Sequence, residues 1–156
     1  MIFKNPLTKE QALQKLRHYC GYQERCHSEV KEKLYELGVS KIHHDEIIAT
    51  LIEENYLNEE RFAIYFAGGK FRMKQWGRIK IKYQLKQKQV SEYSIKKALK
   101  QIEEKAYLNT IKKIATGKLK NLKGERDIFI QKRKLYDYLL QKGFEADLIN
   151  KEINKI

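Results

Sequence analysis

The sequence predicts an all-α protein of three tandem three-helix repeats, arranged as an elongated or curved array. Apolar residues recur three and four positions apart along most of the chain, which is the spacing of one face of a helix. The 156 residues include a single proline, so little interrupts such helices. A short amphipathic helix cannot bury its apolar face alone, and packing between neighbouring helices is therefore expected.

The first repeat is expected over residues 8–57. Thr8 is the predicted N-cap of its first helix, because a threonine side chain can accept a bond from a free helical N–H, and Gly21 is the predicted end. The second helix is expected to end at Gly38, which can adopt a left-handed cap. The third is expected to begin near Asp45, with acidic residues in its first turn.

The same organisation recurs in two further predicted repeats, residues 58–104 and 105–156. Asn58 is expected to start the fourth helix and Ser91 to cap the sixth, since both side chains can accept a bond from a helical N–H. The seventh helix is expected to end near Gly124, and two more helices follow it.

The middle helices of the three sets align with one another over residues 30–39, 81–90 and 135–144. In each copy an apolar residue is followed four positions later by leucine, then by a turn position, then by another apolar residue. The copies begin 51 and 54 residues apart. The turn position is glycine in the first and third copies, but Gln89 in the second, where glycine would relieve a left-handed cap.

One stretch of the second copy has a different periodicity. Residues 78–83 alternate charged and apolar side chains, which is typical of a strand. A strand without a partner cannot satisfy its backbone hydrogen bonds. Because the repeat also aligns this stretch with helices on either side, a helix is expected.

The net charge of +13 is concentrated in the middle of the chain. Residues 1–57 carry a net charge of −1, residues 58–124 of +13 and residues 125–156 of +1. Two windows, 61–91 and 105–124, contain no Asp or Glu at all. A surface that serves only solubility mixes the two signs, so this concentration indicates attraction to a polyanion or an acidic protein.

Large apolar residues are threaded through the first window, so it is expected to fold rather than form a disordered basic tail. The candidate contact residues in the two windows are Lys70, Arg72, Lys74, Arg78, Lys80, Lys82, Lys86, Lys88, Lys112, Lys113, Lys118 and Lys120. The alternative for such a run is a solvated helix face. Three aromatic residues, Phe71, Trp76 and Tyr83, could stack on bases, although aromatic residues at this spacing more often belong to a core.

The sequence gives no sign of a metal site or of catalysis. His18, Cys20, Cys26 and His27 lie within ten residues, but the two cysteines lack the short spacing of zinc ligands. The Gly-Gly-Lys at 68–70 is too short for a phosphate-binding loop, and no nucleophile elbow is present. No metal, no cofactor and no enzymatic activity are therefore expected.

The apolar runs are too short to span a bilayer, and the N-terminus has no apolar signal core. Two cysteines do not make a disulfide framework, which agrees with a reducing cytoplasm. A cytoplasmic monomer is the expectation.

The centre of the chain carries a recognisable pattern of a Tyr-Leu-Asn helix start, an Arg-Phe-Ala segment, a basic spacer and Gly-x-x-(Arg/Lys)-Ile. It resembles the RecX family of regulatory proteins. The matching residues are Tyr56, Leu57, Asn58, Glu60, Arg61, Phe62, Ala63, Gly77, Ile79, Ile81 and Leu85. Asn55, Glu59 and Gln89 depart from the family's usual Gly, Asp and Gly. Shorter similarities near residues 12–38 and 139–144 extend the resemblance to roughly residues 10–150.

The resemblance implies a modulator without catalysis of its own. Such proteins form a curved array of three-helix repeats, bind the groove of the RecA recombinase filament on single-stranded DNA, and restrain its ATPase and strand exchange. The implied context is the regulation of DNA repair and recombination and the SOS response. Weak, nonspecific binding to single-stranded DNA is expected of any surface this basic. Within the motif, Arg61 is interpreted as a surface residue near a helix start and Phe62 as a core anchor.

Two other functions remain open at this point. Three-helix units resemble helix-turn-helix domains, so an autonomous DNA-binding protein is the main alternative. An RNA- or ribosome-associated basic protein is the other.

Overall fold

The computed structural model describes residues 7–156, in which nine α-helices and no strands are present. The first bundle contains α1 (Lys9–Tyr22), α2 (His27–Glu36), a short 3-10 turn (Lys41–His43) and α3 (His44–Glu53). The second contains α4 (Glu59–Gly69), a π-helical turn (Lys70–Lys74), α5 (Arg78–Gln87) and α6 (Glu92–Lys100). The third contains α7 (Glu104–Asn121), α8 (Ile128–Gln141) and α9 (Ala146–Ile153). The predicted all-α fold of three-helix repeats is confirmed.

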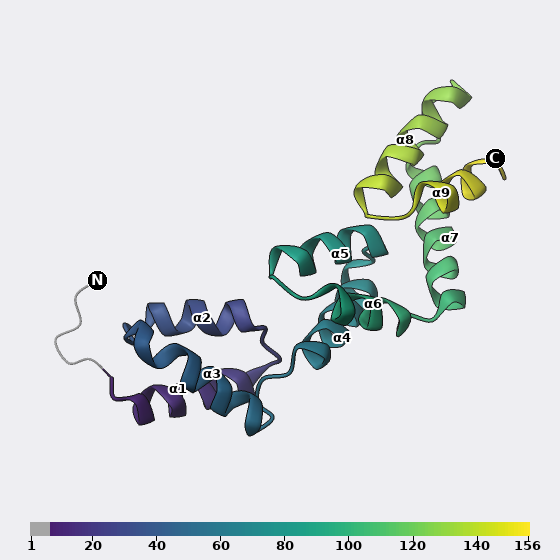
Figure 1. The fold of residues 1–156 in the computed structure, drawn as a ribbon. Coiled ribbons are helices and arrows are strands. Elements are labelled where there is room, and N and C mark those ends of the chain that lie inside the picture. The colour runs from purple at the N-terminus through teal and green to yellow at the C-terminus, as the bar shows by residue number, and fades with distance from the viewer. Residues whose placement is uncertain (1–6) are drawn as a thin grey trace.

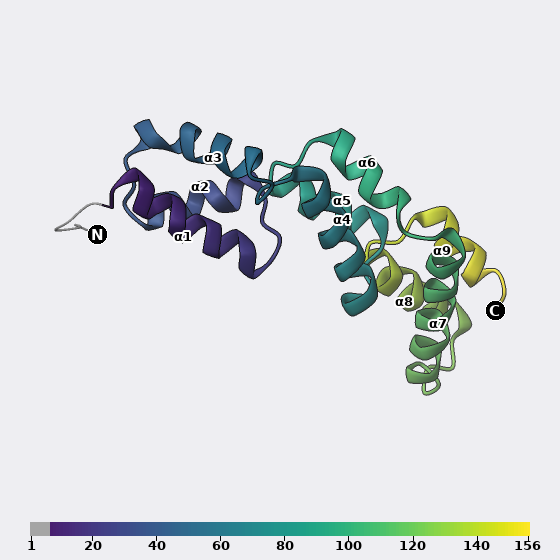
Figure 2. The same ribbon diagram turned by 90° about the horizontal axis from the view of Figure 1, so that it is seen from below.

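The three bundles follow one another along an elongated, curved array (Figures 1 and 2). Helices α1 to α3 lie at one end, α4 to α6 in the middle and α7 to α9 at the other end. None of the helices within residues 7–156 is both long enough and apolar enough to cross a membrane.

The predicted caps of three helices are confirmed. Thr8 accepts a hydrogen bond from Gln11 N, Asn58 from Arg61 N and Ser91 from Ser94 N. Two predicted ends are displaced. The first helix continues one residue past Gly21, to Tyr22, and α7 ends at Asn121, three residues before Gly124, because Leu122 N closes the last turn on Leu119 O.

The three copies of the middle helix end in the same turn. The turn residues Gly38, Gln89 and Gly143 have φ angles of 73°, 64° and 98°. The following residue donates its N–H to the carbonyl five positions earlier, at 3.0, 3.1 and 3.2 Å in the three copies. The alternating stretch is therefore a helix, as its repeat position predicted, and Gln89 is held in a conformation that a side chain disfavours.

Residues 7–156 form two hydrophobic cores rather than three. The first bundle has its own core, which includes Leu16, Leu34 and Leu51. The second and third bundles share one continuous core, in which Ile81 of α5 and Phe144 after α8 are fully buried.

Candidate functional site

The basic side chains predicted as contacts come from the π-helical turn, from α5 and from α7. Among the residues that the structure describes, five of these predicted contacts in the middle bundle have no carboxylate oxygen within 4.0 Å. They are Lys70, Arg72, Lys74, Lys80 and Lys82. Arg72, Lys74 and Lys82 are exposed to solvent. These charges are therefore free to attract an anionic partner.

Trp76 lies at the centre of a cluster of cations. The Lys70 and Lys80 ammonium groups lie 5.1 and 4.6 Å from its ring centroid, and the ring packs against the shared core. Lys142, from the end of α8, donates to the carbonyl of Lys74 at 2.9 Å. Burial, and then the nearby Lys80 charge, lower the pKa of the Lys142 ammonium. The third bundle thus adds a cation to this surface.

Sequence reasoning missed Lys142 as part of this surface. Its signal was present, since Lys142-Gly143-Phe144 is one of the family-like segments, but the segment was interpreted only as a turn. The charge reaches the middle bundle only because the turn packs on the start of α5.

Arg78 lies in a different environment from the other predicted cations. Its guanidinium donates to Glu145 Oε2 at 2.9 Å, pairs with Glu104, and lies 3.8 Å from the centroid of the Tyr107 ring. The Tyr107 hydroxyl accepts from Arg78 N at 2.9 Å and donates to Glu145. Burial, and then the bond to Glu145, hold the pKa of that phenol well above its usual range. The Arg78 charge is therefore neutralised between the second and third bundles.

Two further predicted cations have carboxylate partners. Lys86 lies 3.6 Å from Glu92, in an exposed pair, and Lys88 lies 3.8 Å from Glu29 of the first bundle. The carbonyl of Lys88 also accepts a bond from the Ser28 hydroxyl at 2.9 Å. Lys88 thus takes part in the contact between the first and second bundles.

The predicted cations of the third bundle lie along α7. Lys112, Lys113 and Lys120 are exposed, and Lys118 covers the Tyr138 ring at 4.7 Å. Within residues 7–156, none of the four has a carboxylate within 4.0 Å.

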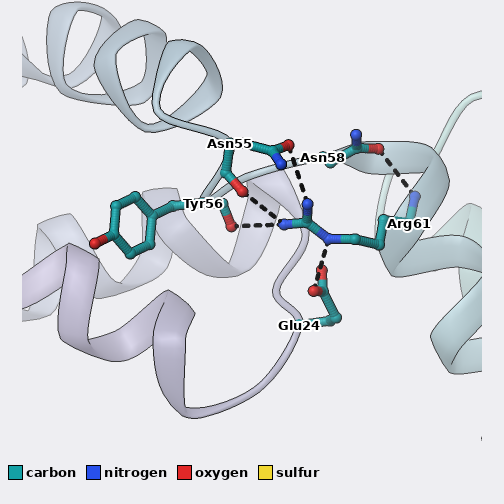
Figure 3. Close-up of polar contacts among 5 residues, drawn as sticks. All are labelled: Glu24, Asn55, Tyr56, Asn58 and Arg61. Atoms are coloured by element: carbon teal, nitrogen blue, oxygen red, sulfur yellow. Dashed lines mark hydrogen bonds and ion pairs between the residues drawn. The ribbon is translucent and has the colours of Figure 1, made fainter.

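Arg61 connects the first bundle to the second (Figure 3). Its side chain donates to Glu24 Oε1 at 2.7 Å, to Asn55 Oδ1 at 3.0 Å, and to the carbonyls of Asn55 and Tyr56 at 2.9 and 3.3 Å. Glu24 lies between α1 and α2, whereas Asn55 and Tyr56 precede α4. Arg61 lies at a helix start and stays partly exposed, as expected, but the sequence did not reveal that its hydrogen-bonding partners lie beyond its own helix. Phe62 is buried in the shared core, as expected.

A cleft of about 470 Å³ opens beside this connection. Its basic side chains come from the middle bundle and its carboxylates from the first. They are Lys70, Arg72, Lys74 and Lys88 on one side, and Glu24 and Glu29 on the other. Tyr65 and Met73 also line it and are exposed. Charge counting along the sequence did not single out either of these two.

The histidine and cysteine residues near α1 do not converge. Cys20 lies in the first core, while Cys26 packs into the core shared by the second and third bundles. Both are free thiols, and burial raises the pKa of Cys20 to about 11. Residues 7–156 contain no cluster of three or more metal-ligating side chains.

Comparison with known proteins identifies the family. Residues 58–99 match the second three-helix domain of RecX, and residues 105–153 match the third. Together these segments make up more than half of the chain. The chain belongs to the RecX family.

The relatives of this RecX-family chain agree with that assignment. It is 34% identical over 129 residues to the regulatory protein RecX of Clostridium perfringens, and it spans 60% of that protein's length. It is 28% identical over 146 residues to the RecX of Prosthecochloris aestuarii, covering 93% of each chain. The crystal structure of RecX from Lactobacillus salivarius has a TM-score of 0.83 and 25% identity, covering 94% of this chain and 95% of that one. RecX is a family of regulatory proteins.

Most residues of the family motif have structural roles here. Asn58 caps α4, Arg61 connects the first two bundles, and Leu57 is buried in the first core. Gly77 is the N-cap of α5, where an added Cβ would lie 2.3 Å from the carbonyl of Gly143. Two of these motif residues, Arg61 and Gly77, therefore lie where the bundles join.

Proposed function

We propose that this RecX-family chain regulates the RecA recombinase. It binds the groove of the RecA filament on single-stranded DNA and inhibits the ATPase and strand exchange, as a cytoplasmic monomer without catalysis of its own. The observation that carries this proposal is the set of cations without carboxylate partners on the middle bundle of a curved array. A long basic surface suits a helical groove lined by protein and DNA phosphates.

The proposed contacts are exposed or accessible cations of the second and third bundles. They are Lys70, Arg72, Lys74, Lys80, Lys82, Lys86, Lys88, Lys112, Lys113, Lys118 and Lys120, with Lys142 added. Arg78 is left out, because its charge is neutralised by Glu145 and Glu104. Changing Arg78 would disturb the packing of the bundles rather than remove a contact.

The test is the ATPase rate of the cognate RecA on single-stranded DNA, titrated with this protein. Wild type is expected to inhibit the ATPase at substoichiometric concentrations relative to RecA, because each bound molecule blocks part of the filament groove. The triple variant Arg72→Glu, Lys74→Glu, Lys82→Glu is expected to lose inhibition, since all three side chains are exposed and reversal turns attraction into repulsion.

The matched control is Lys31→Glu, Lys41→Glu, Lys151→Glu. These exposed lysines lie in the first and third bundles, outside the proposed contacts, and the change in net charge is the same. The control should inhibit like wild type. If both variants inhibit equally, or if wild type acts only by competing for bare DNA, the filament proposal fails. Competition for bare DNA would favour the helix-turn-helix-like alternative.

A further inference from the structure

A second cationic groove lies on the first bundle, outside the basic windows of the sequence. It is an open groove of about 620 Å³ between α1 and α2. Its charged and aromatic lining residues are Lys15, His18, Tyr19, Tyr22, Arg25 and Lys33, and none of its lining residues is a carboxylate. Four other depressions along the array each include a glutamate. The groove is thus cationic although residues 1–57 as a whole carry a net charge of −1.

Several carboxylates of the first bundle are paired with cations outside the groove. Arg17 pairs with Glu54 at 2.6 Å, which joins α1 to the end of α3, and Lys9 pairs with Glu46 of α3. Within the described residues, neither Lys15 nor Arg25 has a carboxylate within 4.0 Å, whereas Lys33 lies 3.7 Å from the exposed Glu36. The groove therefore attracts anions, although its own bundle is slightly acidic overall.

The cations of the groove are held beside tyrosine rings. The Arg25 guanidinium lies 3.8 Å from the Tyr19 ring centroid and 6.0 Å from that of Tyr22, and Arg25 Nε donates to the Tyr19 carbonyl at 3.1 Å. The Lys33 ammonium lies 5.4 Å from the Tyr19 centroid. Tyr22 itself is 79% exposed. An exposed ring next to ordered cations is the arrangement that binds single-stranded nucleic acid, because bases stack on the ring while phosphates pair with the cations.

We propose that this groove binds single-stranded nucleic acid, with one base on Tyr22 and the adjacent phosphates at Lys15, Arg25 and Lys33. Its volume lies in the range of small-ligand sites, and its open form lets a strand pass through. An acidic peptide would use the cations but would leave the exposed ring without a stacking partner. The inference does not depend on the proposed function, since it requires no recombinase.

The first experiment measures the fluorescence anisotropy of a labelled oligothymidylate of about 15 nucleotides, which is long enough for one site. The protein carries Arg72→Glu, Lys74→Glu and Lys82→Glu, so that the middle bundle contributes little. Tyr22→Ala in this background is expected to weaken binding about tenfold, the effect of losing one stacked base. The control Tyr93→Ala removes a 61% exposed tyrosine of α6 and should leave affinity unchanged. Equal affinities for the two variants would overturn the proposal, as would the absence of any binding before the tyrosine is changed.

The second experiment counts phosphate contacts from the salt dependence of binding in the same background. Lys15→Gln with Lys33→Gln is expected to reduce the slope of log K against log salt by about 1.4, or 0.7 for each lost contact with a single strand. The control Lys31→Gln with Lys41→Gln removes the same charge from exposed positions of the first bundle outside the groove. Equal slopes in the two variants would contradict the proposed phosphate contacts.

Photocrosslinking locates the strand in the wild-type protein. An oligonucleotide with 5-iododeoxyuridine is expected to crosslink to Tyr22, and mass spectrometry of the peptides identifies the residue. Crosslinks confined to α4 and α5 would overturn the proposal. Displacement of the oligonucleotide by a polyglutamate peptide at equal charge concentration would also overturn it, because the groove would then recognise acidity and not bases.

Discussion

The two junctions between bundles are built from equivalent elements, but different groups make the contact. Between the second and third bundles, the turn after α8 packs on the start of α5, where Gly77 N donates to Lys142 O at 2.8 Å and Ile79 N to Gly143 O at 3.0 Å. Between the first and second bundles, the turn after α5 packs on the start of α2. Here the Ser28 side chain, not a backbone N–H, donates to Lys88 O at 2.9 Å.

The internal repeat explains this difference. Cys26 lies 51 residues before Gly77, the offset that relates the first two copies, so a side chain stands in the first junction where the second has none. Cys26 N instead donates a hydrogen bond to Glu29 Oε1 in the capping box of α2. The Cys26 thiol is buried in the neighbouring core. A glycine thus permits backbone contact at the second junction, whereas at the first junction side chains make the contact, through the buried Cys26 thiol and the hydrogen bonds of Arg61.

The largest expected effect comes from filling the glycine junction. Gly77→Ala would place a Cβ 2.3 Å from Gly143 C and O, and these backbone atoms cannot move without breaking the two hydrogen bonds. Overpacking of this kind is expected to destabilise the protein by about 3 kcal/mol. Urea denaturation followed by circular dichroism measures the loss.

Gly117→Ala is the matched control for that substitution. An added Cβ at Gly117 of α7 meets nothing within 4 Å, and alanine favours a helix over glycine by about 1 kcal/mol. The control should therefore stabilise the protein. A Gly77→Ala variant as stable as wild type would show that the close backbone approach is not needed.

A smaller effect is expected at the polar junction. Arg61→Ala removes the side-chain bonds to Glu24, Asn55 and Tyr56, and hydrogen bonds that involve a charged group contribute about 2 kcal/mol. The labelling rates of the two free thiols show which part of the protein loses stability. Cys26, which packs into the second core, should be labelled at least about tenfold faster by a thiol reagent, while labelling of Cys20 in the first core should change little.

The control for the polar junction is Arg17→Ala, whose partners Glu10 and Glu54 both lie within the first bundle. It should leave the labelling rate of Cys26 unchanged. Equal acceleration of both thiols by Arg61→Ala would mean that the first bundle unfolds as a whole, which would contradict a role confined to the junction.

The smallest effect is expected from a substitution that gives the turn after α5 the glycine found in the turn after α8. Gln89→Gly removes a side chain from a residue with φ of 64°, as in Gly143, and should stabilise the protein by about 1 kcal/mol. The same replacement at Gln87, the last residue of α5, should destabilise it, because glycine is a poor helix residue. Differential scanning calorimetry compares the two variants. A loss of stability with Gln89→Gly would show that the side chain, and not the turn, matters here.

Local features of this fold could be predicted from the sequence. The caps at Thr8, Asn58 and Ser91 depend on a few adjacent residues, and the left-handed turn at Gln89 follows from the internal alignment. For the alternating stretch, the internal alignment predicted a helix and the periodicity predicted a strand, and the structure has a helix there.

The electrostatic surface could be predicted only in part. A window free of acidic residues in the sequence is not free of them in space: Arg78 meets Glu145, 67 residues away, and Arg61 meets Glu24, 37 residues away. Lys142 joins the surface by the same kind of long-range packing. Distances along the chain carry no information on such pairs, so the contact residues of the candidate site stay a prediction.

The division into two cores also sets an order for synthesis on the ribosome. The first core is complete once Leu57 has emerged, so the N-terminal bundle can fold early. The middle bundle must wait, because its core includes Phe144 and Ile149 from the end of the array. Until α9 leaves the ribosome, the nascent chain carries a finished first bundle followed by about ninety residues whose apolar faces lack their partners, and this segment is where chaperones would bind.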